Sequence, residues 1–499
     1  MSLKSFAAKI FASYVSGKIK KWSSNPLETQ NKVFNHLVKT AANTAFGKDH
    51  DFNSIRSHAD FTKRVPIRDY EQLRPYVNQV VAGAPDILWP GKPLYFAKTS
   101  GTTSGAKYIP LTKESMPTHI AAARNSILCY IAETGKASFV DGKMIFLQGS
   151  PEMTYKNGIG LGRLSGIVAN YVPGYLQKNR LPSWETNCIE NWEDKVDAIV
   201  EETIDKDMRM ISGIPPWVQM YFERLINKAN KPIGELFENF ELFIYGGVNF
   251  EPYRAIFAKL IGRTIPSIEL YPASEGFFAF QDSQKEPGML LQLNSGIFYE
   301  FVKAENFFDD DPERILLDKV VIGQNYVMLI STTAGLWAYN IGDTIQFTST
   351  SPYRVIVSGR IKHFISAFGE HVIGKEVENA LNSAINNQDI LVNEFTVAPQ
   401  VQPENGALPY HEWFIEFEEN PGSIDELALS IDSYLRKQNS YYDDLIIGKI
   451  LEPLHITIIQ KGGFQKYMKS VGKLGGQNKL PRLANDRKIA DQLQPFILF

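Results

Sequence analysis

Short apolar segments alternate with helical segments through the middle of the chain, and this alternation most limits the folds that the chain can adopt. The apolar segments predict strands, and the segments between them have the spacing of amphipathic helices. Such alternation is typical of a largely parallel sheet covered by helices. In such sheets ligands bind beyond the carboxyl ends of the strands. The predicted strands are 143–148, 210–213, 242–245 and 267–271, and the predicted helices are 114–133, with Thr112 as N-cap, 192–205, 217–230 and 250–261.

The pattern changes twice toward the C-terminus. From Met289 onward, strand-like segments at 298–302, 319–322 and 326–332 predict an antiparallel sheet. After a turn at 358–362, a smaller α+β unit is predicted, with strands and helices at 375–386, 395–398, 413–417, 425–437 (capped by Ser423) and 455–459. We therefore expect an α/β protein with mixed sheets covered by helices in a large domain, 1–357, a hinge at 358–362, and a small α+β domain, 363–499.

Composition excludes several classes of protein. The 499 residues carry a net charge of −3, which gives no general attraction for nucleic acid. The two cysteines, Cys129 and Cys188, match no metal-binding spacing and indicate a reducing compartment, so we expect a cytoplasmic location. No segment is apolar for long enough to span a membrane, and we expect no membrane insertion.

The N-terminal segment 3–22 is an amphipathic helix with five lysines and no acidic residue. A transit peptide and a membrane-surface helix are alternatives for this segment. A helix docked on the main body is the favoured interpretation.

A loop rich in Thr, Ser and Gly, ending in Lys107, has the composition of a phosphate-binding loop. Hydroxyl groups of Thr99, Ser100 and Thr102 can donate to phosphoryl oxygens, and Gly101 and Gly105 permit turns that point backbone N–H groups inward. The spacing is not that of a P-loop, and an extended segment follows, so we expect the loop to join two strands. A surface hairpin without a ligand is the alternative.

Four further groups of residues lie where ligands are expected. Two of these groups follow predicted strands. Three of the residues have a plainer alternative: Glu275 as a helix N-terminal acid, Asp343 as a turn residue and Arg360 as a surface arginine. A carboxylate such as Glu275 can hold Mg²⁺ against nucleotide phosphates, and a short acid such as Asp343 can accept both hydroxyls of a ribose. The groups are Gly246-Gly247, Tyr271 to Glu275 with Ser274, Tyr339 to Asp343, and Gly359-Arg360.

The order of these motifs resembles the adenylate-forming superfamily and, more closely, the auxin-responsive Gretchen-Hagen family of acyl-acid amido synthetases. The loop from Thr99 to Lys107 matches the family's Ser/Thr/Gly loop with one residue fewer before the lysine, and Tyr271 to Glu275 matches its Tyr-x-x-Ser-Glu motif. Tyr339 to Asp343 matches Tyr-Arg-x-Gly-Asp with Asn340 in place of arginine, and Lys479 to Arg482 matches a C-terminal Lys-x-Pro-Arg. The resemblance spans nearly the whole chain.

The resemblance implies a two-step ligase that uses ATP and Mg²⁺. A carboxylate attacks the α-phosphate of ATP, pyrophosphate leaves, and an amine, we expect an amino acid, displaces AMP. In this interpretation the Thr/Ser/Gly loop and Lys107 hold the phosphates, and Glu275 contacts the metal. Tyr271 flanks the adenine, Gly246 and Gly247 allow its close approach, and Asp343 binds the ribose. The small domain rotates about 358–362 and carries a catalytic lysine, Lys479, with Lys473 as the competing candidate.

Two other functions remain open at this level: a ligase with coenzyme A or another thiol as acceptor, and a degenerate nucleotide-binding regulatory protein. The segment 144–182 is expected to line the acyl pocket, where Tyr155, Tyr171 and Tyr175 suggest an aromatic or apolar acid. The glycine run 158–162 is expected to form a flexible loop beside it. The identities of the acid and the acceptor cannot be predicted, and we expect a monomer.

Overall fold

The structure is a computed structural model, and it describes residues 2–102, 105–171, 178–247, 250–361, 364–365, 367–370, 372–385, 390–403, 406–471 and 480–498. The chain divides into two units, and each is described by itself. The first comprises Met1–Thr99, Lys107–Glu190 and Asp194–Ile361. The second comprises Ser100–Ala106, Asn191–Glu193 and Lys362–Phe499.

An 11-stranded sheet forms the centre of the first unit, in the order β12-β13-β14-β15-β11-β10-β9-β8-β7-β3-β6. From β6 to β9 neighbouring strands are parallel, and from β9 to β12 they are antiparallel. The predicted change from a parallel to an antiparallel sheet is therefore confirmed. The strands are β3 (Lys143–Phe146), β6 (Arg180–Leu181), β7 (Met208–Ser212), β8 (Leu242–Gly246), β9 (Ser267–Ala273), β10 (Gly276–Phe280), β11 (Met289–Leu291), β12 (Ile297–Lys303), β13 (Asn325–Thr332), β14 (Tyr339–Thr350) and β15 (Tyr353–Arg360).

The strand predicted at 319–322 is wrong. A short 3₁₀ helix, η4 (Leu317–Lys319), lies there instead, and Ile322 forms only an isolated bridge with Phe347. Val321 and Ile322 are exposed, so this apolar run is not part of the core. A short apolar run predicts a strand only where a neighbouring strand buries it.

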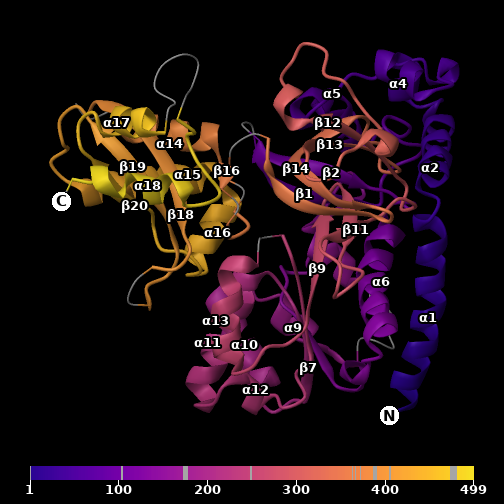
Figure 1. Ribbon diagram of the computed structural model, residues 1–499, viewed down its shortest axis with the longest axis horizontal. Helices are drawn as coiled ribbons and strands as arrows, with labels where there is room; N and C mark the ends of the chain where they lie inside the picture. Colours follow the sequence, from indigo (N-terminus) through magenta and orange to yellow (C-terminus); the bar gives the residue numbers. More distant parts are fainter. Residues whose placement is uncertain are drawn as a thin grey trace. The chain divides into compact units, whose positions relative to one another are not determined.

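Helices surround the sheet of the first unit (Figure 1). The predicted helices before and between the parallel strands are confirmed, with boundaries that differ by one or a few residues. The helices of this region, predicted or not, are α1 (Leu3–Ser23), α2 (Pro26–Ala41), α3 (Ala45–Asp49), α4 (His58–Arg64), α5 (Tyr70–Val81), α6 (Met116–Thr134), α7 (Leu164–Ala169), α9 (Trp184–Asn187), α10 (Trp192–Thr203), α11 (Pro215–Ala229), α12 (Ile233–Leu236) and α13 (Glu251–Ile261), together with the 3₁₀ helices η1 (Phe52–Ser54), η2 (Ser138–Asp141) and η3 (Ala304–Asn306).

The predicted N-cap of α6 is wrong by three residues. The N-cap position is Ser115, and the Thr112 hydroxyl instead accepts a hydrogen bond of 3.1 Å from the backbone N–H of Ser115. Pro117 lies in the first turn of α6, where its missing N–H costs nothing, so the helix begins just before it.

The N-terminal helix α1 packs along α6, which in turn packs on β9 and β10 (Figure 1). Ala12, Val15 and Ile19 of α1 are buried in one apolar cluster with residues of α6 and of the sheet. The prediction of a helix docked on the main body is confirmed. Among the described residues, no helix is both long enough and apolar enough to cross a bilayer.

A second, four-stranded sheet has the order β2-β1-β5-β4. Its strands are β1 (Tyr95–Thr102), β2 (Gly105–Leu111), β4 (Thr154–Lys156) and β5 (Ile159–Gly162). The flexible loop predicted at 158–162 is therefore wrong, because 159–162 form β5, which pairs with both β1 and β4. A Cβ on Gly160 would lie 2.8 Å from the Tyr95 ring, so this glycine permits close packing.

The second unit contains a three-stranded sheet in the order β18-β19-β20 and a two-stranded β16-β17 ribbon. The predicted α+β character of this region is confirmed. The predicted turn at 358–362 is wrong for residues 358–360, which form the end of β15. The elements are β16 (Phe364–Ile365), β17 (Val372–Ile373), β18 (Val392–Gln400), β19 (Tyr410–Phe417), β20 (His455–Ile459), α14 (Gly374–Ile385), α15 (Ile424–Gln438), α16 (Ser440–Ile447), α17 (Gly463–Ser470), α18 (Lys488–Leu493) and η6 (Gln494–Phe496).

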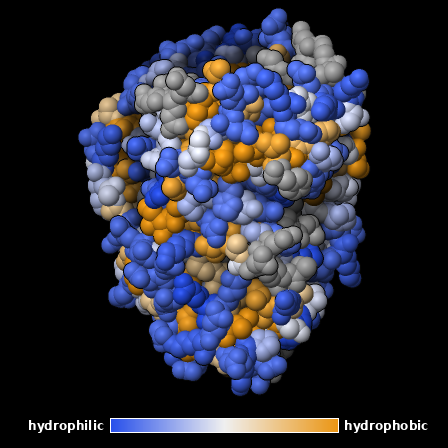
Figure 2. Space-filling view, turned by 90° about the vertical axis from the view of Figure 1, so that its left-hand side faces the viewer, coloured by the Kyte–Doolittle hydropathy of each residue, from blue (hydrophilic) through white to orange (hydrophobic). Residues whose placement is uncertain are grey.

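On the molecular face in Figure 2, hydrophobic residues occur in separated patches among hydrophilic ones. Scattered exposure of this kind is normal for globular proteins. The fold class expected from the sequence, an α/β protein with mixed sheets and a smaller α+β region toward the C-terminus, is confirmed.

Candidate functional site

The Thr/Ser/Gly loop lies between two paired strands. β1 ends at Thr102 and β2 begins at Gly105, so the prediction that the loop joins two strands is confirmed. The loop tip, 103–104, and the side chains of 99–106 lie outside the described residues. Phosphate binding by the hydroxyls of Thr99, Ser100 and Thr102, and by the backbone around Gly101 and Gly105, stays a prediction.

Lys107 is the first residue of β2 whose side chain is described. Its Nζ lies 5.7 Å from the centre of the Tyr70 ring, within the range of a cation–π contact. The Tyr70 hydroxyl accepts a hydrogen bond of 2.8 Å from the backbone N–H of Tyr108. Tyr70 is buried at the start of α5, and burial raises its pKa. Tyr70 therefore positions both the ammonium group and the start of β2.

Two glycines end β8, as expected for a close approach at a sheet edge. A Cβ on Gly246 would lie 2.6 Å from the carbonyl oxygen of Leu270, on the neighbouring parallel strand β9. Gly247 has a φ of +84°, a conformation that side chains other than glycine rarely adopt. Because both constraints come from the backbone, substitution of either residue displaces the end of β8.

A tight turn carries Ser274 and Glu275. Ala273 of β9 pairs with Gly276 of β10, so these two residues are the whole connection between antiparallel strands. The alternative that Glu275 starts a helix is wrong, because no helix follows the turn. Ser274 and Glu275 are both partly exposed at this edge.

Tyr271 and Asp343 lie in contact. The Tyr271 hydroxyl donates a hydrogen bond of 2.5 Å to Oδ2 of Asp343, and both side chains are buried. The Tyr271 ring packs edge-on against Phe278, with 5.0 Å between the ring centres. The structure therefore brings together two residues that the sequence placed in separate motifs.

The segment before Asp343 is held by backbone hydrogen bonds. The Asn340 N–H donates to the carbonyl oxygen of Arg68, and the Asn340 side-chain oxygen accepts from the Gly342 N–H at 2.8 Å. Gly342 has a φ of +88°. Asn340, at the position where the family motif has arginine, thus shapes the bend that presents Asp343.

Arg360 lies beside Asp343 at the level of the backbone. The two residues are partners in the β14-β15 ladder. The guanidinium group of Arg360 lies outside the described side chains, so its role in binding phosphate or ribose stays a prediction.

The lysine candidates of the C-terminal motif, Lys473 and Lys479, lie outside the described residues. The residues that follow them are well anchored. The Thr396 hydroxyl donates to the carbonyl oxygen of Pro481 at 2.7 Å, and Arg482 pairs with Glu394 and Glu378. The chain directly after Lys479 is therefore attached to the edge of β18.

Two of the three predicted acyl-pocket tyrosines, Tyr155 and Tyr171, lie among the described residues, and Tyr175 does not. Tyr155 is 71% exposed on β4. The Tyr171 hydroxyl donates to the Tyr95 hydroxyl at 2.8 Å, and the two rings pack edge to face. Of the two described tyrosines, Tyr171 is therefore the one that contacts another aromatic side chain of this region.

Sequence reasoning missed the buried Lys195. This side chain is 2% exposed, and its ammonium group donates to the carbonyl oxygens of Gln148, just after β3, and Asn187, at 3.0 and 2.6 Å. The pKa of Lys195 is lowered to about 8, mainly by burial; Cys188 opposes this shift and Arg163 adds to it. The sequence contains a signal for this burial, because Lys195 lies on the apolar face of α10 with Val196 and Ile199.

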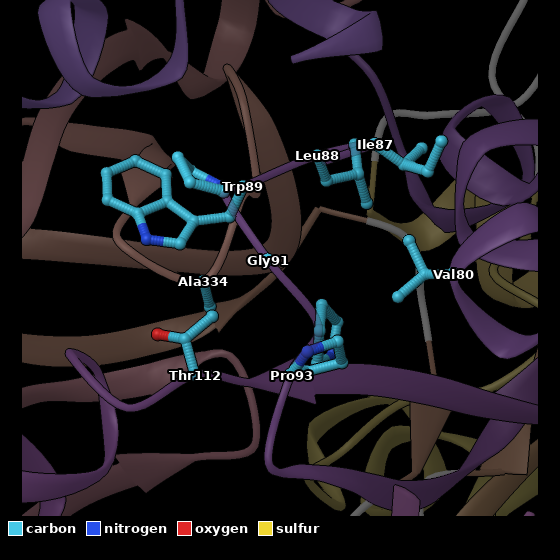
Figure 3. Close-up of a pocket in the computed structure, with 10 residues that line it drawn as sticks. Val80, Ile87, Leu88, Trp89, Gly91, Pro93, Thr112 and Ala334 are labelled. Carbon is cyan, nitrogen blue, oxygen red and sulfur yellow. The ribbon is translucent and has the colours of Figure 1, made fainter. Parts of the chain in front are cut away.

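Two of the pockets that the described residues form lie in the first unit, and neither is lined by the predicted site residues. One has a volume of about 10 Å³ and apolar walls that include Val80, Leu88 and Trp89 (Figure 3), which is room for a single water molecule. The other, about 300 Å³, is lined by polar groups that include His36, Glu114 and Asn294. Within the described part of the chain, no three or more His, Cys, Asp or Glu side chains are grouped to hold a metal ion.

Comparison with known proteins adds an independent line of evidence. Three family models match the chain in order: the GH3 family N-terminal domain at 15–182, the central domain at 290–360 and the C-terminal domain at 375–488.

Similar sequences include a jasmonoyl-L-amino acid synthetase (JAR4) of Nicotiana attenuata, 20% identical with 91% of this chain and 90% of that protein covered. They also include an indole-3-acetic acid-amido synthetase (GH3.4) of Arabidopsis thaliana, which is 22% identical, with 93% of this chain and 90% of that protein covered. A solved structure of the AtGH3.15 acyl acid amido synthetase in complex with 2,4-DB has a TM-score of 0.63 at 15% identity, covering 98% of this chain and 96% of that one.

Proposed function

Because the chain belongs to the GH3 family, we propose that it is an ATP-dependent acyl-acid amido synthetase, a ligase that adenylates a carboxylic acid and transfers the acyl group to an amine. The observation that carries the proposal is the contact between Tyr271 and Asp343, because these residues come from two separate family motifs and meet at one place. The named relatives act as amido synthetases, which favours an amino acid as the amine.

The nucleotide is held at the edge where β8 and β9 end. Asp343 accepts the ribose hydroxyls, and Tyr271, which donates to Asp343, orients that carboxylate and flanks the adenine. Gly246 lets the nucleotide approach the backbone closely, and it also lets the end of β8 lie against β9, where a larger residue would meet Leu270. Lys107 and the Thr/Ser/Gly loop surround the phosphates with positive charge and N–H donors, which is the main requirement of phosphoryl chemistry.

The metal is Mg²⁺, and it neutralises charge on the phosphates when bound. Glu275, in the turn after β9, supplies one carboxylate. A single carboxylate suits Mg²⁺ in a nucleotide site, because this ion keeps several waters and takes its other ligands from phosphate oxygens.

The C-terminal domain takes up one position for the adenylation of the acid and another for the reaction with the amine. In this proposal 363–499 forms a lid that moves about 358–362 and brings Lys479 to the reacting carboxylate for adenylation. Pro481 and Arg482, which follow Lys479 in the chain, bond to β18 of that domain. The enzyme acts in the cytoplasm, where Cys129 and Cys188 stay reduced.

The test is a pyrophosphate-release assay with the full-length protein, ATP and Mg²⁺. A panel of carboxylic acids is tested with pooled amino acids and then with coenzyme A, and products are identified by mass. Release that depends on the acid, with a product equal to acid plus amino acid minus water, supports the proposal. A thioester with coenzyme A supports the thiol acceptor instead.

Two controls separate the possible failures. Calorimetric titration with ATP and Mg²⁺ measures nucleotide binding without an acid substrate, and Asp343→Ala is the matched variant. Binding of ATP by the wild type that is weakened in the variant, with no turnover, means that the correct acid was missing from the panel. No ATP binding by the folded wild-type protein contradicts the proposal.

A further inference from the structure

Helix α1 has two apolar faces, and only one of them is covered. Ala12, Val15 and Ile19 are buried against the rest of the first unit. On the other face, Leu3, Phe6, Ile10 and Tyr14 are 88%, 53%, 59% and 58% exposed. We call these four residues the outer stripe.

The outer stripe is a continuous surface feature. At about 100° per residue, its four positions fall within an arc of about 80°, opposite the buried face. Small residues at positions 7, 13 and 17 lie between and beside them. A single exposed Leu is normal in a folded protein, whereas four large apolar side chains at helical spacing indicate an interaction surface.

Lysines border the outer stripe along both sides. By the same geometry, Lys4 and Lys18 lie on one side and Lys9 and Lys20 on the other, and Lys21 follows the stripe toward the end of the helix. Residues 1–27 contain five lysines and no Asp or Glu, although the whole chain has a net charge of −3.

Contacts with neighbouring residues extend this basic border. The ammonium group of Lys18 lies 4.4 Å from the centre of the Tyr14 ring. The exposed Arg124 of α6 lies over the ring of Phe11, at 5.8 Å.

Asp141, an acidic side chain that bonds to α1 and its N-cap, does not neutralise this border. Asp141 accepts hydrogen bonds from Ser2 and from Ser5, the latter at 2.7 Å. Ser5 is buried, so Asp141 lies on the covered side of the helix. Its carboxylate is engaged in holding the N-terminal end of α1 to the unit.

We propose that α1 docks in the plane of an anionic lipid bilayer. The outer stripe enters the boundary between headgroups and acyl chains, and the flanking lysines contact lipid phosphates and carboxylates. Apolar residues bordered by lysines are what such an interface requires. The buried face stays on α6, so docking needs no unfolding.

Charge favours this occupant over a second copy of the chain. In a two-fold pairing through the outer stripe, the lysines of one α1 would face those of the other, with no Asp or Glu within residues 1–27 to compensate. An anionic membrane supplies the missing negative charge.

The test is flotation of the full-length protein with vesicles of phosphatidylcholine alone and of phosphatidylcholine mixed with phosphatidylserine. We expect binding to the mixed vesicles only, and weakening by salt. Ile10→Asp should abolish binding. The triple change Lys18→Gln, Lys20→Gln and Lys21→Gln should weaken it about a hundredfold. Leu429→Asp is the matched control, because Leu429, like Ile10, is an exposed aliphatic residue on a helix. This variant should bind the vesicles as the wild type does.

Several results would overturn the proposal. Absence of binding to the mixed vesicles does so, as does equal binding by wild type and Ile10→Asp. Dimerisation that Ile10→Asp removes, without vesicle binding, would identify a second copy as the occupant. Thermal melting of each variant shows that it is folded, and because α1 lies outside the proposed nucleotide site, ATP binding by calorimetry should be unchanged.

Discussion

The hydroxyl of Tyr271 and the carboxylate of Asp343 meet at 2.5 Å, although 72 residues separate them in sequence. Their strands, β9 and β14, are not neighbours, since β15, β11 and β10 lie between them in the sheet. Strands in a twisted sheet rotate progressively, and the contact shows that this sheet curls enough to close the distance. The curl places the ends of the parallel strands and the bend before Asp343 at one site.

The first prediction concerns this pair. Asp343→Ala should raise the KM for ATP about tenfold to a hundredfold, because it removes a charged acceptor for the ribose hydroxyls. Tyr271→Phe should raise it less, since the carboxylate remains but loses its orienting donor. Initial rates of pyrophosphate release measure both effects.

Tyr353→Phe is the control for this prediction. The Tyr353 hydroxyl donates to the carbonyl oxygen of Leu317 at 2.8 Å, so the variant also loses a buried hydroxyl hydrogen bond in the same unit. Its KM for ATP should not change. An unchanged KM in Asp343→Ala as well would mean that Asp343 is only a structural residue of the bend.

The second prediction concerns the catalytic lysine. Lys479→Ala should lower kcat for adenylation by orders of magnitude with little change in ATP affinity, because a lid lysine stabilises charge in the transition state rather than in the ground state. The amine step, started from preformed acyl-adenylate, should persist.

Two further variants decide between the lysines. If Lys473→Ala shows this behaviour and Lys479→Ala does not, Lys473 is the catalytic residue. Lys488→Ala removes an exposed lysine of the same domain and should have no effect. Normal adenylation in all three variants contradicts a lid lysine from this segment.

The third prediction concerns a buried ion pair in the first unit. Glu300 is fully buried and accepts hydrogen bonds from Arg314 at 2.9 and 2.7 Å, and the His58 ring nitrogen lies 2.6 Å from its carboxylate. Although burial raises the pKa of Glu300, Arg314 and His58 together hold it below its usual value. Arg314→Met should lower the free energy of unfolding by about 3 to 5 kcal/mol, because it leaves a buried carboxylate without its main partner.

The exposed pair of Glu28 and Lys32 is the contrast. Lys32→Met should leave the free energy of unfolding nearly unchanged, since exposed pairs in water contribute little. Denaturant unfolding measures both variants. Equal effects would show that burial does not govern the strength of the Glu300 contact.

The fourth prediction concerns pH and Lys195. Burial holds the pKa of Lys195 at about 8, below its ordinary value of 10.5. Between these two pH values the unfolded chain binds more protons at this site than the folded protein, so the folded state gains stability as pH rises. The free energy of unfolding of the wild type minus that of Lys195→Met should therefore rise with pH in this window, by up to about 1.4 kcal/mol per unit.

The same measurement with Lys32→Met, which removes an exposed lysine, is the control for the loss of a lysine as such. A flat difference for Lys195→Met would show that the Lys195 ammonium group is no less stable in the fold than in water.

Most of the regular structure could be predicted from the sequence, because hydrophobic periodicity is local. The strands β3, β7, β8 and β9 and the helices α10, α11 and α13 follow from it, as do α14, α15, β18, β19 and β20 of the second unit. The failures have a common cause. At 319–322 an apolar run lacks a neighbouring strand, and at 159–162 glycines form a strand because Tyr95 packs on them. In both places, whether the segment forms a strand depends on a pairing partner that lies far away in sequence.

The sequence by itself determined the fold class, the family and the identity of the motif residues, since these depend on residue types and their order. Tertiary structure alone decided that Tyr271 contacts Asp343, that Lys195 is buried against two carbonyl oxygens, and that the second apolar face of α1 is left uncovered. The physical reason is that sheet curl and helix docking arise from contacts between distant segments. No local pattern of residues records which of two apolar helix faces the rest of the chain will cover.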